Sequence, residues 1–198
     1  CDKASRVRLR STRATFKSGD ANEHYQPPIL NIADVDCLPM EKLAPKPPPQ
    51  RVLEKFQVRM GLIAPKLGAQ KLGYNLSIIA PGKQAFPFHN HRVNEEMFFI
   101  IEGRGELRLG DRRYPVRSGD VIACPPGGPE TAHQLVNTSD AELKILAVST
   151  RLSPEICDYP DSGKFAIRGE FPPGADGKPQ MFSFIGRGEQ NLDYWDKE

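Results

Sequence analysis

The sequence is poor in the features that mark several large classes of protein. Among 198 residues it has one tryptophan and only four each of cysteine, methionine and histidine. Its longest apolar run, residues 97–101, is far shorter than the ~18 residues that a membrane-spanning helix needs. Glycine does not recur at every third position, and no heptad pattern is sustained. These absences exclude a helical membrane protein, a collagen and a coiled coil.

The four cysteines do not form a recognisable motif. Cys1, Cys37, Cys124 and Cys157 lie far apart and include no C-x-x-C pair. A chain of this length does not need disulfides to fold. We therefore expect reduced thiols and a reducing, cytoplasmic location. A disulfide between Cys37 and Cys157 remains the alternative.

Charge is nearly balanced overall but not along the chain. Lys and Arg number 27 against 25 Asp and Glu, which gives a net charge of +2. Residues 1–17 carry six basic side chains and one acidic one, so they contribute +5 and the other 181 residues carry −3. We interpret residues 1–25 as a basic, disordered leader. Contact of this leader with nucleic acid or an anionic surface, or a transit-peptide role, stays open, but the acidic body argues against DNA binding.

Proline and glycine are abundant, at 19 and 17 residues. Together they make up roughly 18% of the chain against a usual ~12%, which indicates a globular domain rich in turns. Residues 26–50 are bounded by two proline clusters, and we interpret them as an arm with an edge strand at 29–35 and a helical turn within 36–43. We expect a β-barrel over 51–150. Residues 151–198 would form an extension that packs on the barrel or on a dimer partner.

From about residue 51 the pattern is typical of strands separated by turns. The predicted strands are 74–80, 96–102, 106–109, 112–116, 120–124, 132–137 and 143–150. Short helices are predicted at 51–56 and 154–158, and no segment has a long helical stripe. Several short strands at regular spacing indicate an all-β sandwich or closed barrel.

Three of the four histidines fall into one pattern. His89 and His91 flank Asn90, and residues i and i+2 of an extended strand face the same side. Glu96 opens an apolar strand, where an unpaired charge is costly to bury. His133 begins a later strand after a loop rich in proline and glycine. Three imidazoles and one carboxylate make a site suited to Zn, Fe, Mn, Ni, Cu or Co.

Two spaced motifs resemble those of the cupins, a superfamily of small β-barrels. The first comprises Gly82, His89, His91, Glu96 and Gly103, with one residue more than usual between Gly82 and His89. The second comprises Gly119, Pro125, Gly127, His133 and Asn137, with five residues instead of two between Gly127 and His133. The resemblance implies the cupin double-stranded β-helix, a jelly-roll barrel with N- and C-terminal arms.

The same resemblance implies one divalent transition metal per chain, such as Zn, Fe, Mn or Ni. Its ligands would be His89, His91, Glu96 and His133. The fourth histidine, His24, lies in the leader and receives no role. We interpret Asn137 as a residue that holds a loop.

Other residues are weaker candidates for the chemistry of the site. Glu130, in the lengthened loop, and Tyr159 are the candidate general bases. Lys164 closes a compact turn over 159–164 and could bind an anionic substrate. Phe98 is a candidate substrate contact, although a core position is the simpler interpretation.

Two function classes remain open. The first is a metal-dependent enzyme of the isomerase or dioxygenase type that acts on a small polar metabolite. The lengthened loop, the 159–164 turn and the D-Y-W ending also resemble small cupins described as sugar-phosphate isomerases. The second is a non-catalytic sensor or storage module. We expect a homodimer, and we expect the single tryptophan, Trp195, to dock on the body or on a second subunit.

Overall fold

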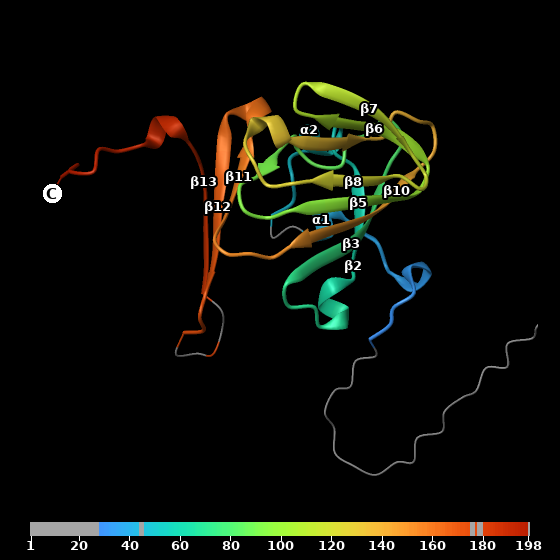
Figure 1. The fold of residues 1–198 in the computed structure, drawn as a ribbon, viewed down its shortest axis with the longest axis horizontal. Coiled ribbons are helices and arrows are strands. Elements are labelled where there is room, and N and C mark those ends of the chain that lie inside the picture. The colour runs from blue at the N-terminus through green and yellow to red at the C-terminus, as the bar shows by residue number, and fades with distance from the viewer. Residues whose placement is uncertain (1–27, 44–45, 175–176, 178–179, 198) are drawn as a thin grey trace, which may run out of the picture.

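The chain folds mainly as antiparallel β-sheet (Figure 1). The structure is a computed structural model that describes residues 28–43, 46–174, 177 and 180–197. The basic leader, with Cys1 and His24, lies outside the described residues. Among those described, no helix is long and apolar enough to cross a membrane. The all-β jelly-roll prediction is confirmed.

The largest sheet has six strands. Its order is β1 (Leu38–Pro39), β2 (Val58–Leu62), β3 (Leu72–Ile79), β10 (Leu143–Thr150), β5 (Glu96–Glu102) and β8 (Val121–Cys124). Strand β10 pairs with both β3 and β5, although its sequence neighbour is β9. This crossing of the chain from one sheet to another is what closes a jelly roll rather than a simple meander.

Two smaller sheets complete the architecture. The three-stranded sheet has the order β7 (Arg112–Arg117), β6 (Arg104–Leu109) and β9 (His133–Val136). The four-stranded sheet has the order β13 (Gln180–Arg187), β12 (Lys164–Phe171), β11 (Glu155–Tyr159) and β4 (Asn90–His91). A backbone bridge between His89 and His133 joins the two.

The core lies between the six-stranded and three-stranded sheets. Alternate residues of β5 supply it, with Ile100 fully buried and Phe99 on the outer face partly exposed. This period of two is that of a strand with one face buried. The buried residues of this core are Val58, Ile79, Ala85, Ile100, Leu107, Val116, Ile122, Cys124, Leu135, Leu143 and Ile145.

Tight turns connect the barrel strands. Gly103, between β5 and β6, has a φ of 91°, in the left-handed region that favours glycine. A Cβ at this position would also lie 2.5 Å from the carbonyl oxygen of Glu142. The charged residues on either side of Gly103 therefore flank a turn that only glycine fits without strain.

The N-terminal arm packs on the outer face of the six-stranded sheet. Val35, Ile63 and Leu76 form a small second core there. The edge strand predicted at 29–35 is wrong: this stretch holds the 3-10 helix η1 (Ile32–Asp34), because the Asn31 side chain accepts a hydrogen bond from the Ala33 N–H. The edge strand is β1 instead. Short helices follow at α1 (Met40–Leu43) and α2 (Gln50–Leu53), close to the predicted helical turns.

The C-terminal part differs most from the prediction. The helix predicted at 154–158 is wrong, because this stretch is β11, which pairs with both β12 and β4. Strands β2, β12 and β13 were not predicted either. The remaining short elements are 3-10 helices: η2 (Ala64–Leu67), η3 (Pro129–Thr131), η4 (Pro160–Ser162) and η5 (Gly188–Gln190).

Two side-chain expectations can be compared with the structure directly. Cys37, Cys124 and Cys157 are free thiols, so the alternative Cys37–Cys157 disulfide is not formed. Trp195 is 72% exposed and contacts the ring of Tyr194. The expectation that Trp195 docks on the body of its own chain is therefore wrong.

Candidate metal centre

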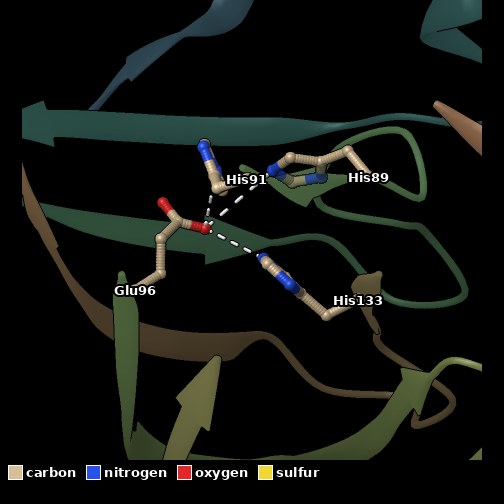
Figure 2. A group of neighbouring side chains, drawn as sticks. All are labelled: His89, His91, Glu96 and His133. Carbon is tan, nitrogen blue, oxygen red and sulfur yellow. Dashed lines mark hydrogen bonds and ion pairs between the residues drawn. The ribbon is translucent and has the colours of Figure 1, made fainter. Parts of the chain in front are cut away.

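Four side chains from three parts of the barrel meet at one point (Figure 2). Glu96 Oε2 lies 2.9 Å from His133 Nε2, 3.4 Å from His91 Nε2 and 3.9 Å from His89 Nε2. One ligand atom from each of the four residues lies within 4.8 Å of every other. The structure thus brings together all four residues that the sequence predicts as ligands.

Backbone pairing positions the three histidines. His89 and His133 exchange two backbone hydrogen bonds, of 3.2 and 2.8 Å, so their side chains project from neighbouring chain segments. Strand β4 pairs His91 with Cys157 of β11. The H-x-H segment is therefore held by β9 on one side and by β11 on the other, and its two imidazoles face the barrel together as the alternation predicts.

In each imidazole Nε2 faces the centre, and a contact of Nδ1 on the opposite side orients the ring. The Nδ1 of His89 lies 2.8 Å from the carbonyl oxygen of Pro87, and that of His133 lies 3.2 Å from the carbonyl oxygen of Thr131. His91 Nδ1 lies 3.3 Å from Cys157 Sγ. The carbonyl oxygens behind His89 and His133 accept a hydrogen bond from a protonated Nδ1, which leaves the Nε2 of each of these two rings to face the centre. This is the arrangement that metal-binding histidines use.

Burial and neighbouring charges set the protonation of the cluster. Burial and the nearby His133 lower the pKa of His89 to about 4. Burial also lowers the pKa of His91, but Cys157 and the Glu96 carboxylate outweigh it and raise that pKa to about 10. Burial raises the pKa of Glu96, yet the hydrogen bond with His133 and the nearby His91 hold it well below its usual range. Without a metal, the centre therefore pairs the Glu96 carboxylate with a protonated His91.

The residues present fit a divalent transition metal. His91 Nε2 is a buried polar atom with no hydrogen-bond partner, and such atoms are rare in folded proteins unless something else satisfies them. Three imidazole nitrogens and one carboxylate oxygen are donors that Zn, Fe, Mn and Ni accept. A cation at the centre would replace the His91 proton beside the Glu96 carboxylate and would give His91 Nε2 a partner.

The lengthened loop before His133 does not displace that residue. Its extra residues form η3, and the chain re-enters the sheet at β9 with His133 only 2% exposed. Glu130 lies in η3 with an exposed side chain, and its carboxylate accepts a hydrogen bond from the Gly128 N–H. Glu130 is therefore engaged with its own loop.

Tyr159 and Phe98 lie beside the cluster, and Lys164 lies beside Tyr159. The Tyr159 ring stacks on His89 at 6.1 Å, and Lys164 Nζ lies 4.9 Å from the centre of the Tyr159 ring. Burial raises the pKa of Tyr159, so its phenol keeps its proton. The Phe98 ring lies 5.7 Å from that of His133.

A small pocket adjoins the centre inside the barrel. Its volume is about 30 Å³, enough for one or two water-sized molecules. His89, His133, Gln134 and Ser77 contribute the polar part of its wall. The rest is apolar: Ala85, Phe86, Phe98, Leu135, Ile145 and Ala147.

Sequence reasoning missed three residues that organise the site. Cys157 contacts His91 directly. Glu155 is buried, and its carboxylate accepts hydrogen bonds from the backbone N–H groups of Val93 and Asn94 and lies 3.7 Å from His91 Nδ1. Asn90, the middle residue of the H-x-H motif, is fully buried, and its amide donates to the Gly127 carbonyl and the Asp158 carboxylate. In the sequence, only the alternation of apolar and polar residues around Cys157 could have predicted strand β11.

The chain is similar to several known proteins. It is 39% identical over 61 residues to an uncharacterized protein of Methanocaldococcus jannaschii, covering 31% of this chain and 46% of that protein. It is 34% identical over 59 residues to quercetin 2,3-dioxygenase of Bacillus subtilis, covering 29% of this chain and 18% of the enzyme. The chain thus spans less than half the length of these two curated relatives.

A solved structure extends the likeness to most of the chain. A sugar phosphate isomerase of the cupin superfamily from Silicibacter pomeroyi superposes with a TM-score of 0.64 at 23% identity, covering 85% of this chain and 98% of that one. At this identity the likeness shows the fold. Residues 75–149 also match the family described as the cupin domain, and they include all four residues of the cluster. Residues 75–149 therefore match the cupin domain, and the chain has the all-β cupin fold.

Proposed function

We propose that the chain is a metal-dependent enzyme that oxidises a small polar metabolite with dioxygen. The observation that carries this proposal is the pocket of about 30 Å³ beside His89 and His133. It is large enough for a diatomic molecule, and most of its wall is apolar. Quercetin 2,3-dioxygenase, to which part of the chain is similar, is an enzyme of this class.

The side chains around the centre suit oxygenation better than isomerisation. An isomerase needs a general base within hydrogen-bond reach of the substrate. Glu130 is exposed and bonded to its own loop, and Tyr159 keeps its proton at neutral pH. The pocket wall has no titratable side chain other than the two histidine ligands.

Different residues of the chain would have different roles in the proposed reaction. His89, His91, Glu96 and His133 would hold the metal, which when bound supplies Lewis acidity and, if redox-active, electron transfer. Phe86 and Phe98 would give the inner side an apolar lining. The metabolite would approach from the side of Tyr159, where Lys164 offers a positive charge to an anionic group.

Oxygen uptake with a panel of small polyols, hydroxy acids and flavonols tests this proposal. We expect uptake when the protein is loaded with Fe, Ni or Cu and none with Zn. The Ala147→Leu variant, which fills the pocket, should lose uptake at least about tenfold while it retains metal. Turnover of a sugar phosphate by the zinc form without oxygen would overturn the proposal in favour of an isomerase. Metal binding without any turnover would indicate a binding module.

A further inference from the structure

Strand β13 leaves an unusual amount of apolar surface uncovered. It forms the edge of the four-stranded sheet and lies at the outer margin of the molecule (Figure 1). Met181, Phe182, Phe184 and Ile185 are 68, 49, 39 and 60% exposed. Apolar side chains therefore line both faces of an edge strand. Strands with this pattern are normally found inside a sheet.

The outer face of this sheet is apolar as well. Its register places Ile167 opposite Phe184 and Gly169 opposite Phe182, so the side chains of these positions share one face. Phe165 packs against Phe184 at 5.9 Å on the same face. Phe171 at the end of β12 is 53% exposed.

The sequence of β13 is nearly symmetric about its centre. Residues 181–185 read M-F-S-F-I. An antiparallel pair centred on Ser183 would place Met181 opposite Ile185 and Phe182 opposite Phe184 of the other strand. Both pairs then lie on matching faces, because residues separated by an even number of positions share a face. No charged side chain lies between residues 180 and 186 to oppose such pairing.

We propose that β13 pairs antiparallel with β13 of a second copy of this chain, centred on Ser183. The two four-stranded sheets then form one eight-stranded sheet across a two-fold axis. This isologous contact gives each free edge a partner and closes the assembly at two chains.

The C-terminal segment extends the same interface. It leaves β13 after Arg187 and runs away from the body of its own chain (Figure 1). In the antiparallel pair, Gly186 lies opposite Gln180 of the other strand, so the segment that follows β13 and carries Leu192, Tyr194 and Trp195 would extend toward the second copy. These three side chains are 71, 84 and 72% exposed.

The area available is sufficient for a stable dimer. A fully exposed aromatic side chain presents about 150–250 Å². On that basis, the exposed apolar residues of β12, β13 and the C-terminal segment present on the order of 1,000 Å² per chain. Stable interfaces bury about 800 Å² per partner.

Sedimentation equilibrium of the full chain tests the proposal. We expect a dimer at micromolar concentration and at least about tenfold weaker association for Ile185→Lys, which places a charge at the pairing edge. The matched control is Val121→Lys, because Val121 is 69% exposed on β8, the free edge of the six-stranded sheet. A wild-type chain that stays monomeric at tens of micromolar overturns the proposal. So does a dimer that Val121→Lys dissociates and Ile185→Lys does not.

Cross-linking tests the register independently of any folding defect. Directly opposed residues of an antiparallel pair have Cα atoms about 4.5–5.5 Å apart, within the range of a disulfide. Ser183→Cys should therefore form a covalent dimer on mild oxidation, whereas the wild type, with its native cysteines, should not. Gln180→Cys is the control, because its two copies would lie about 20 Å apart. A covalent dimer from Gln180→Cys but not from Ser183→Cys contradicts the proposed register.

Discussion

At the scale of single residues, the candidate metal centre depends on groups that contact the three histidines but are not ligands themselves. Each of the three histidines presents Nε2 inward because its Nδ1 has a partner behind it. For His89 and His133 that partner is a backbone carbonyl, which no side-chain substitution removes. For His91 it is the thiol of Cys157, with Glu155 slightly farther away. His91 is thus the ligand whose orientation a mutation can change most easily.

Replacing Cys157 should weaken metal binding without removing a ligand. We expect Cys157→Ala to lower metal affinity about tenfold, because loss of an outer partner typically costs 10–100-fold and Glu155 can still orient Nδ1. Isothermal titration with Zn²⁺ measures the change. Cys37→Ala is the matched control, since Cys37 lies in the arm core, away from the centre. Equal affinities of the two variants would contradict this role of Cys157.

Some residues of the centre could be predicted from the sequence, and others could not. His89, His91 and Glu96 follow from local rules, because strand alternation fixes which side chains share a face. His133 is a candidate because it begins a strand after a loop rich in proline and glycine, and the resemblance to a spaced motif supports it. Cys157 and Glu155 could not be predicted, because they reach His91 through the pairing of β11 with β4, across more than sixty residues that carry no local signal of contact.

At the scale of elements, close backbone approach between β6 and β9 constrains the barrel. A Cβ on Gly105 of β6 would lie 2.4 Å from the Val136 carbonyl oxygen and 2.9 Å from Leu143 Cδ2. Since a backbone atom cannot move aside as a flexible side chain can, Gly105→Ala should lower the free energy of unfolding by about 1–3 kcal/mol. Urea unfolding measures this.

A matched glycine provides the control for that prediction. Gly188 has open space around an added Cβ, so Gly188→Ala should change stability by less than about 0.5 kcal/mol. If both variants have the wild-type midpoint, the close packing of β6 against β9 is not as described.

An ion pair between Arg108 and Asp161 holds the turn that carries Tyr159 and Lys164. Both guanidinium nitrogens of Arg108 donate to the Asp161 carboxylate, at 2.8 and 2.9 Å. The Arg108 hydrogen bonds lower the pKa of Asp161 below its ordinary 3.8. The pair is partly exposed, with 26% of the Arg108 and 48% of the Asp161 side chain accessible. It should therefore contribute only about 0.5 kcal/mol.

This pair predicts a pH dependence of defined sign. Because the folded pKa of Asp161 is depressed, its contribution is present above about pH 4 and is lost as the pH falls through the folded pKa. The stability difference between wild type and Asp161→Asn should thus shrink toward zero in acid. Thermal unfolding at several pH values measures it. Asp140→Asn, at a 94% exposed position, should show no such trend.

Prediction of elements succeeded where a strand has one buried face and failed elsewhere. Strands β5 and β10 have the predicted bounds, because β5 is an apolar run between two glutamates and the residues of β10 alternate well enough to indicate a strand. The stretch 154–158 was predicted as a helix, because the pairing that makes it β11 comes from β12 and β4. Strand β13 was missed because Ser183 interrupts its apolar run and its apolar residues lie on both faces, so it shows neither a continuous run nor a period of two.

At the scale of the whole molecule, the abundant prolines and glycines lie in particular parts of the fold. Proline-rich segments run along the outside of the six-stranded sheet as an arm, and glycines close the barrel turns. The barrel holds the four candidate ligands, and the flanking four-stranded sheet supplies His91 from β4 and its neighbours Cys157 and Glu155 from β11. The remaining apolar surface of that sheet is where a second chain would bind.

The most direct test of the central claim is elemental analysis of metal in natively purified protein. We predict about one transition metal ion per chain in the wild type and close to none in the His89→Ala, His91→Ala double variant. His24→Ala, which alters the one histidine outside the cluster, should retain the wild-type content. A folded double variant with the full metal content of the wild type would contradict the assignment of His89, His91, Glu96 and His133 as the metal centre.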